Sequence, residues 1–218
     1  GGYFTIRMFI HKYQDIISLE NLLVVWQRFL RGKRHKKDVM EFEINLADNL
    51  IKLFQELKNK TYKHGEYSAF NISYPNPSNI HKANVHDRVA HHLLYKELYP
   101  YFEKLFIYDS YSCREDKGTH RALERFKFFA GKVSKNHTNN CYILKCDIKK
   151  FFASIDHEVL INILRRHIQD QDIIYFIKKV TDSFHATSHG VGLPLGNLTS
   201  QLFVNIYMHE FDMYVKQK

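Results

Sequence analysis

Residues 142–157 read Tyr142-Ile-Leu-Lys-Cys-Asp147-Ile-Lys-Lys-Phe151-Phe152-Ala-Ser-Ile-Asp156-His157, and this stretch decides the expected fold. An apolar run that ends in an acid predicts a short buried strand from Cys141 to Asp147, followed by a turn and a helix through His167. A carboxylate at a strand end is the kind of oxygen ligand that Mg²⁺ prefers, and the main-chain carbonyl of Ile148 would add a second. Taken alone, an acid in this place more often caps a turn or a helix.

A second informative stretch is Gly192-Leu-Pro194-Leu195-Gly196-Asn197-Leu198-Thr199-Ser200-Gln201. Two glycines and a proline predict a fixed loop with few side chains, which leads into a helix. Backbone of this kind can approach a flat ligand such as a base pair closely. In isolation, the same pattern is also typical of an ordinary loop before a helix.

A third group of segments is rich in basic residues near expected helix starts: Asp87-Arg88, 109–114 and 117–123. Helix N-termini that carry basic side chains bind phosphate well. The adjacent His91 and His92 have no further ligands at zinc spacing, so we expect them to be exposed or satisfied within the core.

The remainder of the chain predicts helices and one further strand. Apolar spacing indicates helices, with Ser18, Asp38 and Thr119 as expected caps. The strand runs from Tyr67 to Tyr74 and ends at the prolines that follow. The helices are expected at 18–29, 38–58, 84–106 with an interruption near Pro100, 119–132, 170–183 and 198–214. The broad class is therefore α+β.

Composition bounds the function. The 218 residues include 44% apolar residues, which is enough for a buried core of one domain or two small ones. The net charge of +9 and pI near 9.3 suit a polyanionic partner, although an ordinary basic surface has the same composition. The basic run at 28–37 is either a solvated turn or a phosphate contact. Three cysteines without a C-x-x-C pattern indicate a reducing, cytoplasmic location, and no apolar run is long enough for a membrane span.

In this order and at these distances, the three segments resemble reverse transcriptases of the bacterial and organellar branch, which includes group II introns, retrons and diversity-generating retroelements. The resemblance covers residues 67–214 and implies a right-hand polymerase fold, mostly helical with a small sheet. It assigns 1–66 to an N-terminal helical extension and fingers, 67–140 to the fingers, and 141–218 to part of the palm. The loop pair Leu195-Gly196 followed by Ser200-Gln201 is most similar to diversity-generating retroelement enzymes.

The resemblance also assigns roles to individual residues. Asp147, with the Ile148 carbonyl, is expected to hold the catalytic metal ions, Mg²⁺ or Mn²⁺, and Phe152 to contact the nucleotide sugar and reject a 2′-hydroxyl. The other residues expected to bind substrate are Pro194, Gly196, Gln201 and Lys82, and those expected to bind nucleic acid are Arg88, Arg114, Lys117 and Arg121. The implied partners are template RNA, a primer, deoxynucleoside triphosphates and an accessory protein.

Two departures from the family pattern matter. The stretch Pro75-Asn76-Pro77-Ser78 has neither Lys nor Arg where relatives carry basic residues that touch the triphosphate, so we expect Lys82 to replace them. The chain also contains no Asp-Asp pair, whereas the family needs a Tyr-x-Asp-Asp hairpin for two-metal nucleotidyl transfer. We therefore expect a truncated polypeptide that is inactive alone, from a parent RNA-directed DNA polymerase. The alternatives are a non-catalytic RNA-binding module and an antiphage defence protein of the same fold.

Overall fold

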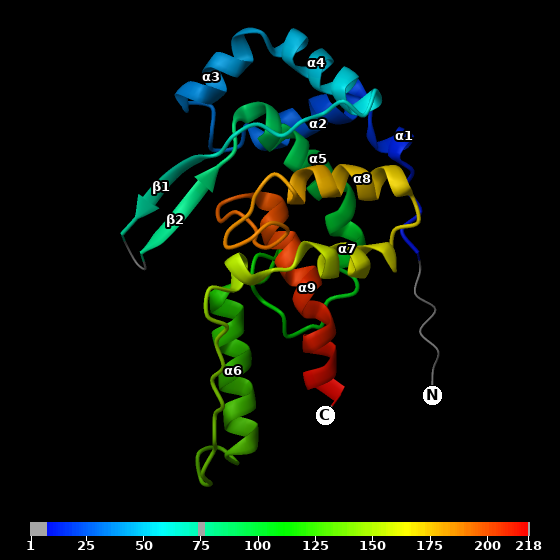
Figure 1. Cartoon of the computed structure of the whole chain (residues 1–218). Coiled ribbons are helices and arrows are strands. Elements are labelled where there is room, and N and C mark those ends of the chain that lie inside the picture. The colour runs from blue at the N-terminus through cyan, green and yellow to red at the C-terminus, as the bar shows by residue number, and fades with distance from the viewer. Residues whose placement is uncertain (1–7, 74–76, 218) are drawn as a thin grey trace.

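A computed structural model of the chain describes residues 8–73 and 77–217, and Figure 1 shows their arrangement. Helices dominate and one antiparallel hairpin forms the sheet, which confirms the mostly helical α+β class. In chain order the elements are α1 (Tyr13–Ile16), α2 (Leu19–Phe29), α3 (Lys37–Ile44), α4 (Leu46–Lys58), β1 (Ser68–Ile72), β2 (Ser78–Lys82), α5 (Val85–Phe102), α6 (Thr119–Val133), the 3₁₀ helix η1 (Phe151–Ser154), α7 (His157–Arg165), α8 (Gln171–Thr181) and α9 (Leu198–Gln217). Tyr74, Pro75 and Asn76 lie outside the described residues.

The helix starts follow the capping rules at some positions and depart from them at others. The Ser18 hydroxyl accepts a hydrogen bond from the Asn21 main-chain N–H at 3.1 Å, which confirms this cap of α2. Two expected caps are wrong. Lys36 is the N-cap of α3, and Asp38 lies in the first turn of that helix. Gly118 is the N-cap of α6, and Thr119 is its first residue.

The helix expected at 38–58 is two helices, α3 and α4, separated at Asn45. The backbone of Asn45 has φ −114° and ψ 42°, which is outside the helical region. The side chain of Asn49 donates to the Phe42 carbonyl at 2.9 Å, so the break does not leave this carbonyl unsatisfied. By contrast, α5 continues through Pro100 without interruption.

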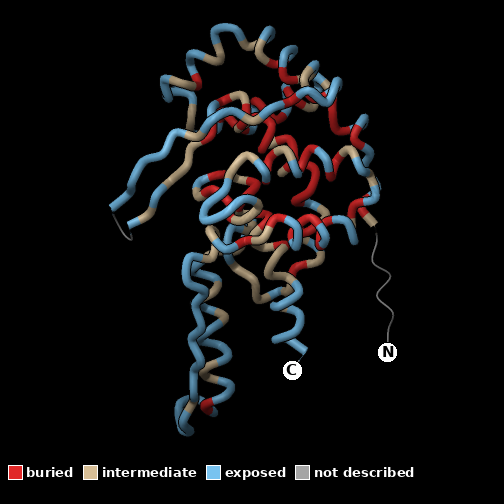
Figure 2. Tube along the Cα trace, viewed as in Figure 1, coloured by how far each residue is buried: buried red, intermediate tan, exposed pale blue. Residues whose placement is uncertain are grey.

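The hairpin contains a strand that the sequence pattern did not predict. β1 and β2 pair antiparallel, with Phe70 opposite Ile80, whereas the prolines were expected to end the strand region. β1 ends at Ile72, and pairing resumes at Ser78, directly after Pro77. Figure 1 shows the hairpin extending to one side, away from the helices over most of its length, and Figure 2 shows that β1 is exposed.

The core is built around α5. This helix packs against α2 on one side and α9 on the other, so nearly all of its faces are covered. Leu93 and Leu98 of α5 are fully buried, together with Leu22 of α2 and Phe203 of α9. The buried residues of α5 include the polar Asp87, His91 and Glu97 as well as apolar ones, so the helix shows little amphipathic pattern. The buried stretches in Figure 2 gather around this centre.

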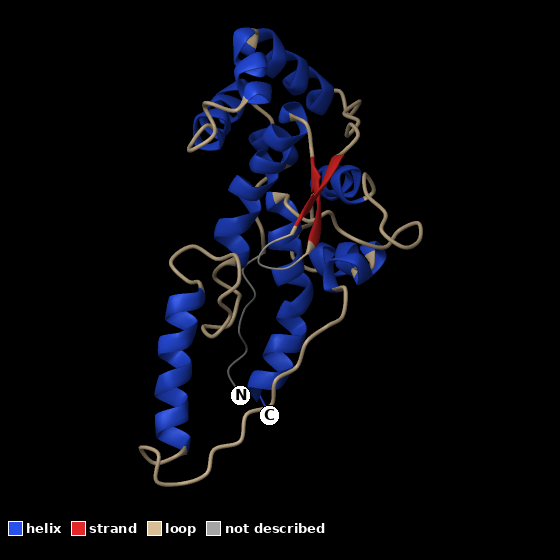
Figure 3. Cartoon of the chain, turned by 90° about the vertical axis from the view of Figure 1, so that its left-hand side faces the viewer, coloured by secondary structure: helices blue, strands red, loops and turns tan. Residues whose placement is uncertain are grey.

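Helix α6 differs from the others because it projects away from the core (Figures 1 and 3) and contains no buried residue. Its apolar side chains include Phe126 and Phe128, which are exposed. The far end of α9 also exposes apolar side chains, among them Phe211. None of the helices in the described ranges combines the length and apolar content that a membrane crossing requires.

The strand predicted from Cys141 to Asp147 is wrong. Residues 140–148 form no regular element, and the side chains of Tyr142 and Leu144 are 92% and 89% exposed. A strand is stabilised by hydrogen bonds to a neighbouring strand, and no described strand pairs with this segment. The turn and the helix that were expected after it are present, as η1 and α7.

Candidate functional site

A cleft of about 370 Å³ lies beneath the hairpin, where α2, β2, α5 and the start of α9 meet. It brings together four of the residues singled out in the sequence: Lys82, Arg88, Gly196 and Gln201. The residues that line it are Phe29, Lys33, Phe70, Ile80, Lys82, Arg88, His91, His92, Gly196, Asn197, Leu198 and Gln201. We call it the hairpin cleft.

Three cations and one carboxylate meet at the hairpin cleft. Lys82 donates to Asp38 at 2.7 Å, and the Arg88 guanidinium pairs with the same carboxylate. Burial alone would raise the pKa of Asp38, but the hydrogen bonds and charges of Lys82 and Arg88 outweigh it and hold this pKa below its usual value. The third cation, Lys33, has a lowered pKa because it is partly buried and lies near Arg88. The site therefore carries a net positive charge.

One aromatic ring, that of Phe29, lies against two of these cations. The Lys33 ammonium lies 4.9 Å from the centre of the Phe29 ring, and the Arg88 guanidinium lies 5.1 Å from the same ring. The Nε atom of Arg88 is buried and makes no hydrogen bond to any described residue. Burial and the charges of Lys33 and Arg88 lower the pKa of His92 to about 4, so His92 adds no charge to the cleft at neutral pH.

The Gly192–Gly196 loop is fixed against the hairpin. The His81 N–H of β2 donates to the Leu195 carbonyl at 3.0 Å, and the Asn197 side chain donates back to the His81 carbonyl at 2.8 Å. Gly196 has φ +98°, and a Cβ atom on it would lie 2.7 Å from Cγ2 of Ile80. Gly196 is exposed at the cleft, whereas Pro194 is buried and is not among the lining residues.

Phe152 is hydrogen-bonded to the Gly192–Gly196 loop through its main chain. It lies in η1, is half-buried, and its carbonyl accepts a hydrogen bond from the Leu193 N–H at 2.8 Å. The Ile155 carbonyl accepts from the Gly192 N–H at 2.7 Å, so two main-chain bonds hold the segments together. The two stretches that decided the sequence interpretation are therefore adjacent in space.

Asp147 and Ile148 lie in the extended, exposed segment before η1 and do not line the hairpin cleft. One carboxylate and one carbonyl are two oxygen donors, whereas Mg²⁺ demands near-octahedral coordination. In residues 8–73 and 77–217 no group of three His, Cys, Asp or Glu side chains has the geometry of a metal site. The described residues therefore do not form a metal site by themselves.

A second cleft, of about 410 Å³, lies at the start of α6 and contains Lys117 and Arg121. Its walls combine cations with exposed aromatic rings. The Lys117 ammonium lies 3.7 Å from the centre of the Tyr108 ring, and the Arg125 guanidinium lies 5.3 Å from that of Phe128. We call it the α6 cleft. Flat rings and cations in one groove are the features that bind single-stranded nucleic acid.

Arg114 does not contribute to either cleft. Its side chain is 4% exposed and makes a two-pronged ion pair with Glu103, with donor to acceptor distances of 2.6 and 2.9 Å. The guanidinium also donates to the carbonyls of Ile107 and Ser110. Most of its N–H groups are used within the loop that leads to α6. These contacts make Arg114 a support of that loop.

Two contributors to the hairpin cleft were not predicted as site residues. Lys33 belongs to the basic run at 28–37 and is half-buried at the cleft, whereas the other Lys and Arg side chains of the run are exposed. Asp38 was expected only to cap a helix. His91 is fully buried and hydrogen-bonded, which confirms that it is satisfied within the core.

Comparison with known proteins identifies a family whose sequence model matches this chain. The sequence model of the family described as "Reverse transcriptase (RNA-dependent DNA polymerase)" matches residues 76–218. The group II intron-encoded protein LtrA of Lactococcus lactis subsp. cremoris is 26% identical over 97% of this chain and 36% of its own length. An uncharacterized 91 kDa protein in a cob intron of Schizosaccharomyces pombe is 29% identical over 60% of this chain and 16% of its own length.

Among solved structures, a chain of a partial Cas6-RT-Cas1–Cas2 complex has a similar fold, with a TM-score of 0.60 and 17% identity. The likeness covers 95% of this chain and 36% of that chain. The chain thus spans at most 36% of the length of these three relatives.

Proposed function

Because this chain belongs to the reverse transcriptase family, we propose that the hairpin cleft binds the triphosphate of an incoming deoxynucleotide during RNA-templated DNA synthesis by the full-length protein. The observation that supports it is the meeting of Lys33, Lys82 and Arg88 with the Gly196 backbone in one cleft. Cations in a partly enclosed cleft raise the local concentration of a polyanion.

The ion pairs of Asp38 support this proposal. Its carboxylate pairs with Lys82 and Arg88, as a phosphate oxygen would. A guanidinium binds two oxygens of a phosphate as readily as those of a carboxylate. The triphosphate would therefore displace Asp38 from these two cations. In this proposal Lys82 replaces the basic residues that relatives carry at positions 75–78 and that touch the triphosphate.

The other parts of the site follow from the same assignment. In this proposal 1–66 is an N-terminal extension with fingers, 67–140 completes the fingers, and 141–218 is part of the palm. Phe152, held under the loop, lies against the nucleotide sugar, and Gly196 and Gln201 face the nascent base pair. Two-metal transfer with Mg²⁺ or Mn²⁺ needs carboxylates in addition to Asp147.

Template RNA is the second ligand of the proposal, and the α6 cleft is its binding groove. Lys117 and Arg121 would neutralise phosphates while Tyr108 and Phe128 stack on bases. An accessory protein is a further proposed partner, and the matched structure is itself described as part of a complex. The loop ending in Ser200-Gln201 favours the diversity-generating retroelement branch, and the three free cysteines fit the cytoplasm.

Primer extension by the full-length protein on an RNA template tests the proposal. Lys82→Ala should raise the KM for deoxynucleotides by about tenfold with little change in RNA affinity, because it removes one charged contact. Lys60→Ala is the matched control, since Lys60 pairs only with Asp172 on the surface. An unchanged KM in Lys82→Ala would overturn the role of the cleft. Salt-sensitive RNA binding without any nucleotide incorporation would instead identify a non-catalytic RNA-binding module.

A further inference from the structure

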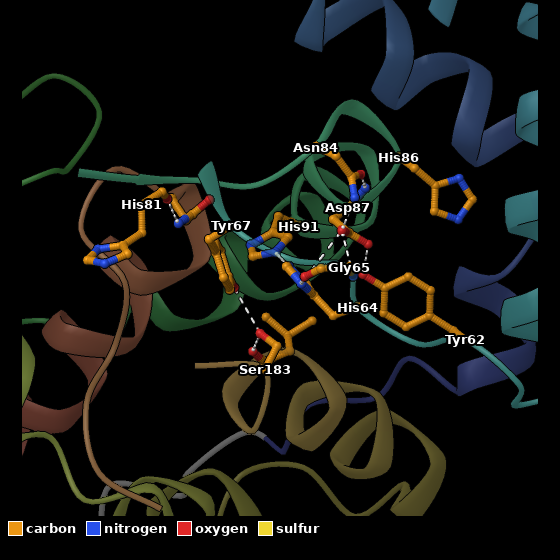
Figure 4. Close-up of polar contacts among 12 residues, drawn as sticks. Tyr62, His64, Gly65, Tyr67, His81, Asn84, His86, Asp87, His91 and Ser183 are labelled. Atoms are coloured by element: carbon orange, nitrogen blue, oxygen red, sulfur yellow. Dashed lines mark hydrogen bonds and ion pairs between the residues drawn. The ribbon is translucent and has the colours of Figure 1, made fainter. Parts of the chain in front are cut away.

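A buried hydrogen-bond network lies beside the hairpin cleft (Figure 4) and has no part in the function proposed above. At its centre is Asp87, in the first turn of α5, which is 1% exposed. Its carboxylate accepts hydrogen bonds from the Tyr62 hydroxyl at 2.7 Å, the Gly65 N–H at 2.9 Å and the Asn84 side chain at 2.6 Å. A carboxylate with three donors is satisfied although it is buried.

From Asp87 a chain of contacts leads through two histidines to α9. Nδ1 of His64 lies 3.6 Å from the Asp87 carboxylate and 2.6 Å from the Gly65 carbonyl. Nε2 of His64 lies 2.9 Å from Nε2 of His91, and Nδ1 of His91 lies 2.6 Å from the Thr199 hydroxyl. The side chains of His64 and His91 are both buried.

The donors and acceptors at its two ends fix the direction of each hydrogen bond in this series of contacts. The Gly65 carbonyl can only accept, so Nδ1 of His64 carries a proton, and Nε2 of the neutral ring is then an acceptor. His91 must therefore donate from its Nε2. Burial and the nearby His64 and His92 lower the pKa of His91 to about 3, so it is neutral and its Nδ1 accepts from the Thr199 hydroxyl.

The end of the chain of contacts is at the hairpin cleft. Thr199 lies in the first turn of α9, directly after three residues that line the cleft, 196–198. His91 lines the same cleft. A bond between His91 and Thr199 therefore joins α5 to the segment that forms one wall of the cleft.

We propose that His64 and His91 are positioning residues, which hold Thr199 and the Gly192–Gly196 loop in the orientation that binds the nucleotide. This inference rests on the proposed function of the cleft.

The neighbours of His64 hold its ring in place. Asp87 and His91 face it from α5, and the Tyr67 ring stacks on it with centroids 4.6 Å apart. Through His91 these contacts reach the Thr199 hydroxyl of α9.

The first test is independent of nucleotide chemistry. Long-range ¹H–¹⁵N spectra of the imidazole rings in this chain at neutral pH should show the Nδ1–H tautomer for His64 and the Nε2–H tautomer for His91. The opposite tautomer at either ring, or an imidazolium at His91, would overturn the proposal. If the full-length protein extends no primer, the proposed function fails while this measurement still decides the bond directions.

The second test uses the nucleotide kinetics of the full-length protein. Thr199→Val should raise the KM for deoxynucleotides about tenfold with kcat within about twofold, and Thr199→Ser should restore it, because only the hydroxyl is needed. Thr181→Val is the matched control, since this equally buried hydroxyl bonds only within its own helix. His64→Phe keeps a ring on Tyr67 but removes the acceptor of the His91 Nε2–H, so it should raise the KM as Thr199→Val does. An equal effect of both valine variants, or an unchanged KM in His64→Phe, would refute the positioning role.

Discussion

Replacing Gly196 by alanine should perturb the hairpin cleft through one specific contact. Gly196 has φ +98°, where an L-residue is strained by about 1–2 kcal/mol. The new Cβ would also lie 2.7 Å from Cγ2 of Ile80, and such overpacking typically costs about 1–3 kcal/mol. The two terms together predict a loss of about 2–5 kcal/mol in the free energy of unfolding, which is a large part of the stability of an ordinary domain.

Gly32→Ala separates the two terms. Gly32 also has a positive φ, +68°, but a Cβ on it would meet nothing within 4 Å. This variant should therefore lose only the backbone contribution of about 1–2 kcal/mol. Ile80→Ala removes the atom that clashes, so the double variant Gly196→Ala/Ile80→Ala should recover about 1–2 kcal/mol relative to the sum of the single changes.

Urea unfolding of the four variants measures these differences, and the KM for deoxynucleotides reports on the cleft. We expect Gly196→Ala to raise the KM, because the loop must move away from β2, and Gly32→Ala to leave it unchanged. Equal losses of stability in the two glycine variants, with no recovery in the double variant, would show that the loop is not held against Ile80.

Four further substitutions test other parts of the site. Arg114→Ala should lower the free energy of unfolding by about 2–3 kcal/mol because Glu103 loses its partner. Arg121→Ala should leave stability unchanged and reduce the slope of RNA affinity against salt concentration by about one, which corresponds to one lost phosphate contact. The opposite pattern would contradict both assignments. Because the pKa of Asp38 is held below its ordinary 3.8, its ion pairs stabilise the fold above that pH and are lost as the pH falls through the lowered value, so Asp38→Asn should flatten the acid side of a stability profile. Phe152→Ala in the full-length protein should admit ribonucleotides more readily, and an unchanged ratio of deoxynucleotide to ribonucleotide use would refute the steric role.

The sequence predicted those parts of the site that depend on local signals. Ser18 caps its helix as its side chain predicts, and the glycines of the loop adopt the positive φ that only glycine tolerates without strain. The family resemblance placed Lys82 and Gly196 at the substrate and Arg88 at the nucleic acid, and nothing in their spacing brings the three together, so the structure alone reveals that they line one cleft.

The roles of charged side chains were less predictable, because a side chain's charge does not reveal its partner. Arg114 has the same local pattern as a phosphate-binding residue, yet Glu103, eleven positions earlier, occupies its guanidinium. Lys33 lies between α2 and α3, and Asp38 lies in the first turn of α3. Their part in the hairpin cleft depends on packing against α5, where Arg88, 50 residues after Asp38, pairs with the Asp38 carboxylate. Such contacts belong to the tertiary structure.

The segment from Cys141 to Asp147 shows the same limit for secondary structure. Its β-branched and aromatic residues favour extended backbone, and the structure is extended there. Pairing is a separate requirement, because a strand's hydrogen bonds and its apolar face are both satisfied by a neighbour that local sequence does not specify. Among the described residues no such neighbour lies beside it, so Tyr142 and Leu144 remain in water. An element that supplied this pairing would bury both side chains together and place Asp147 at the end of a paired strand.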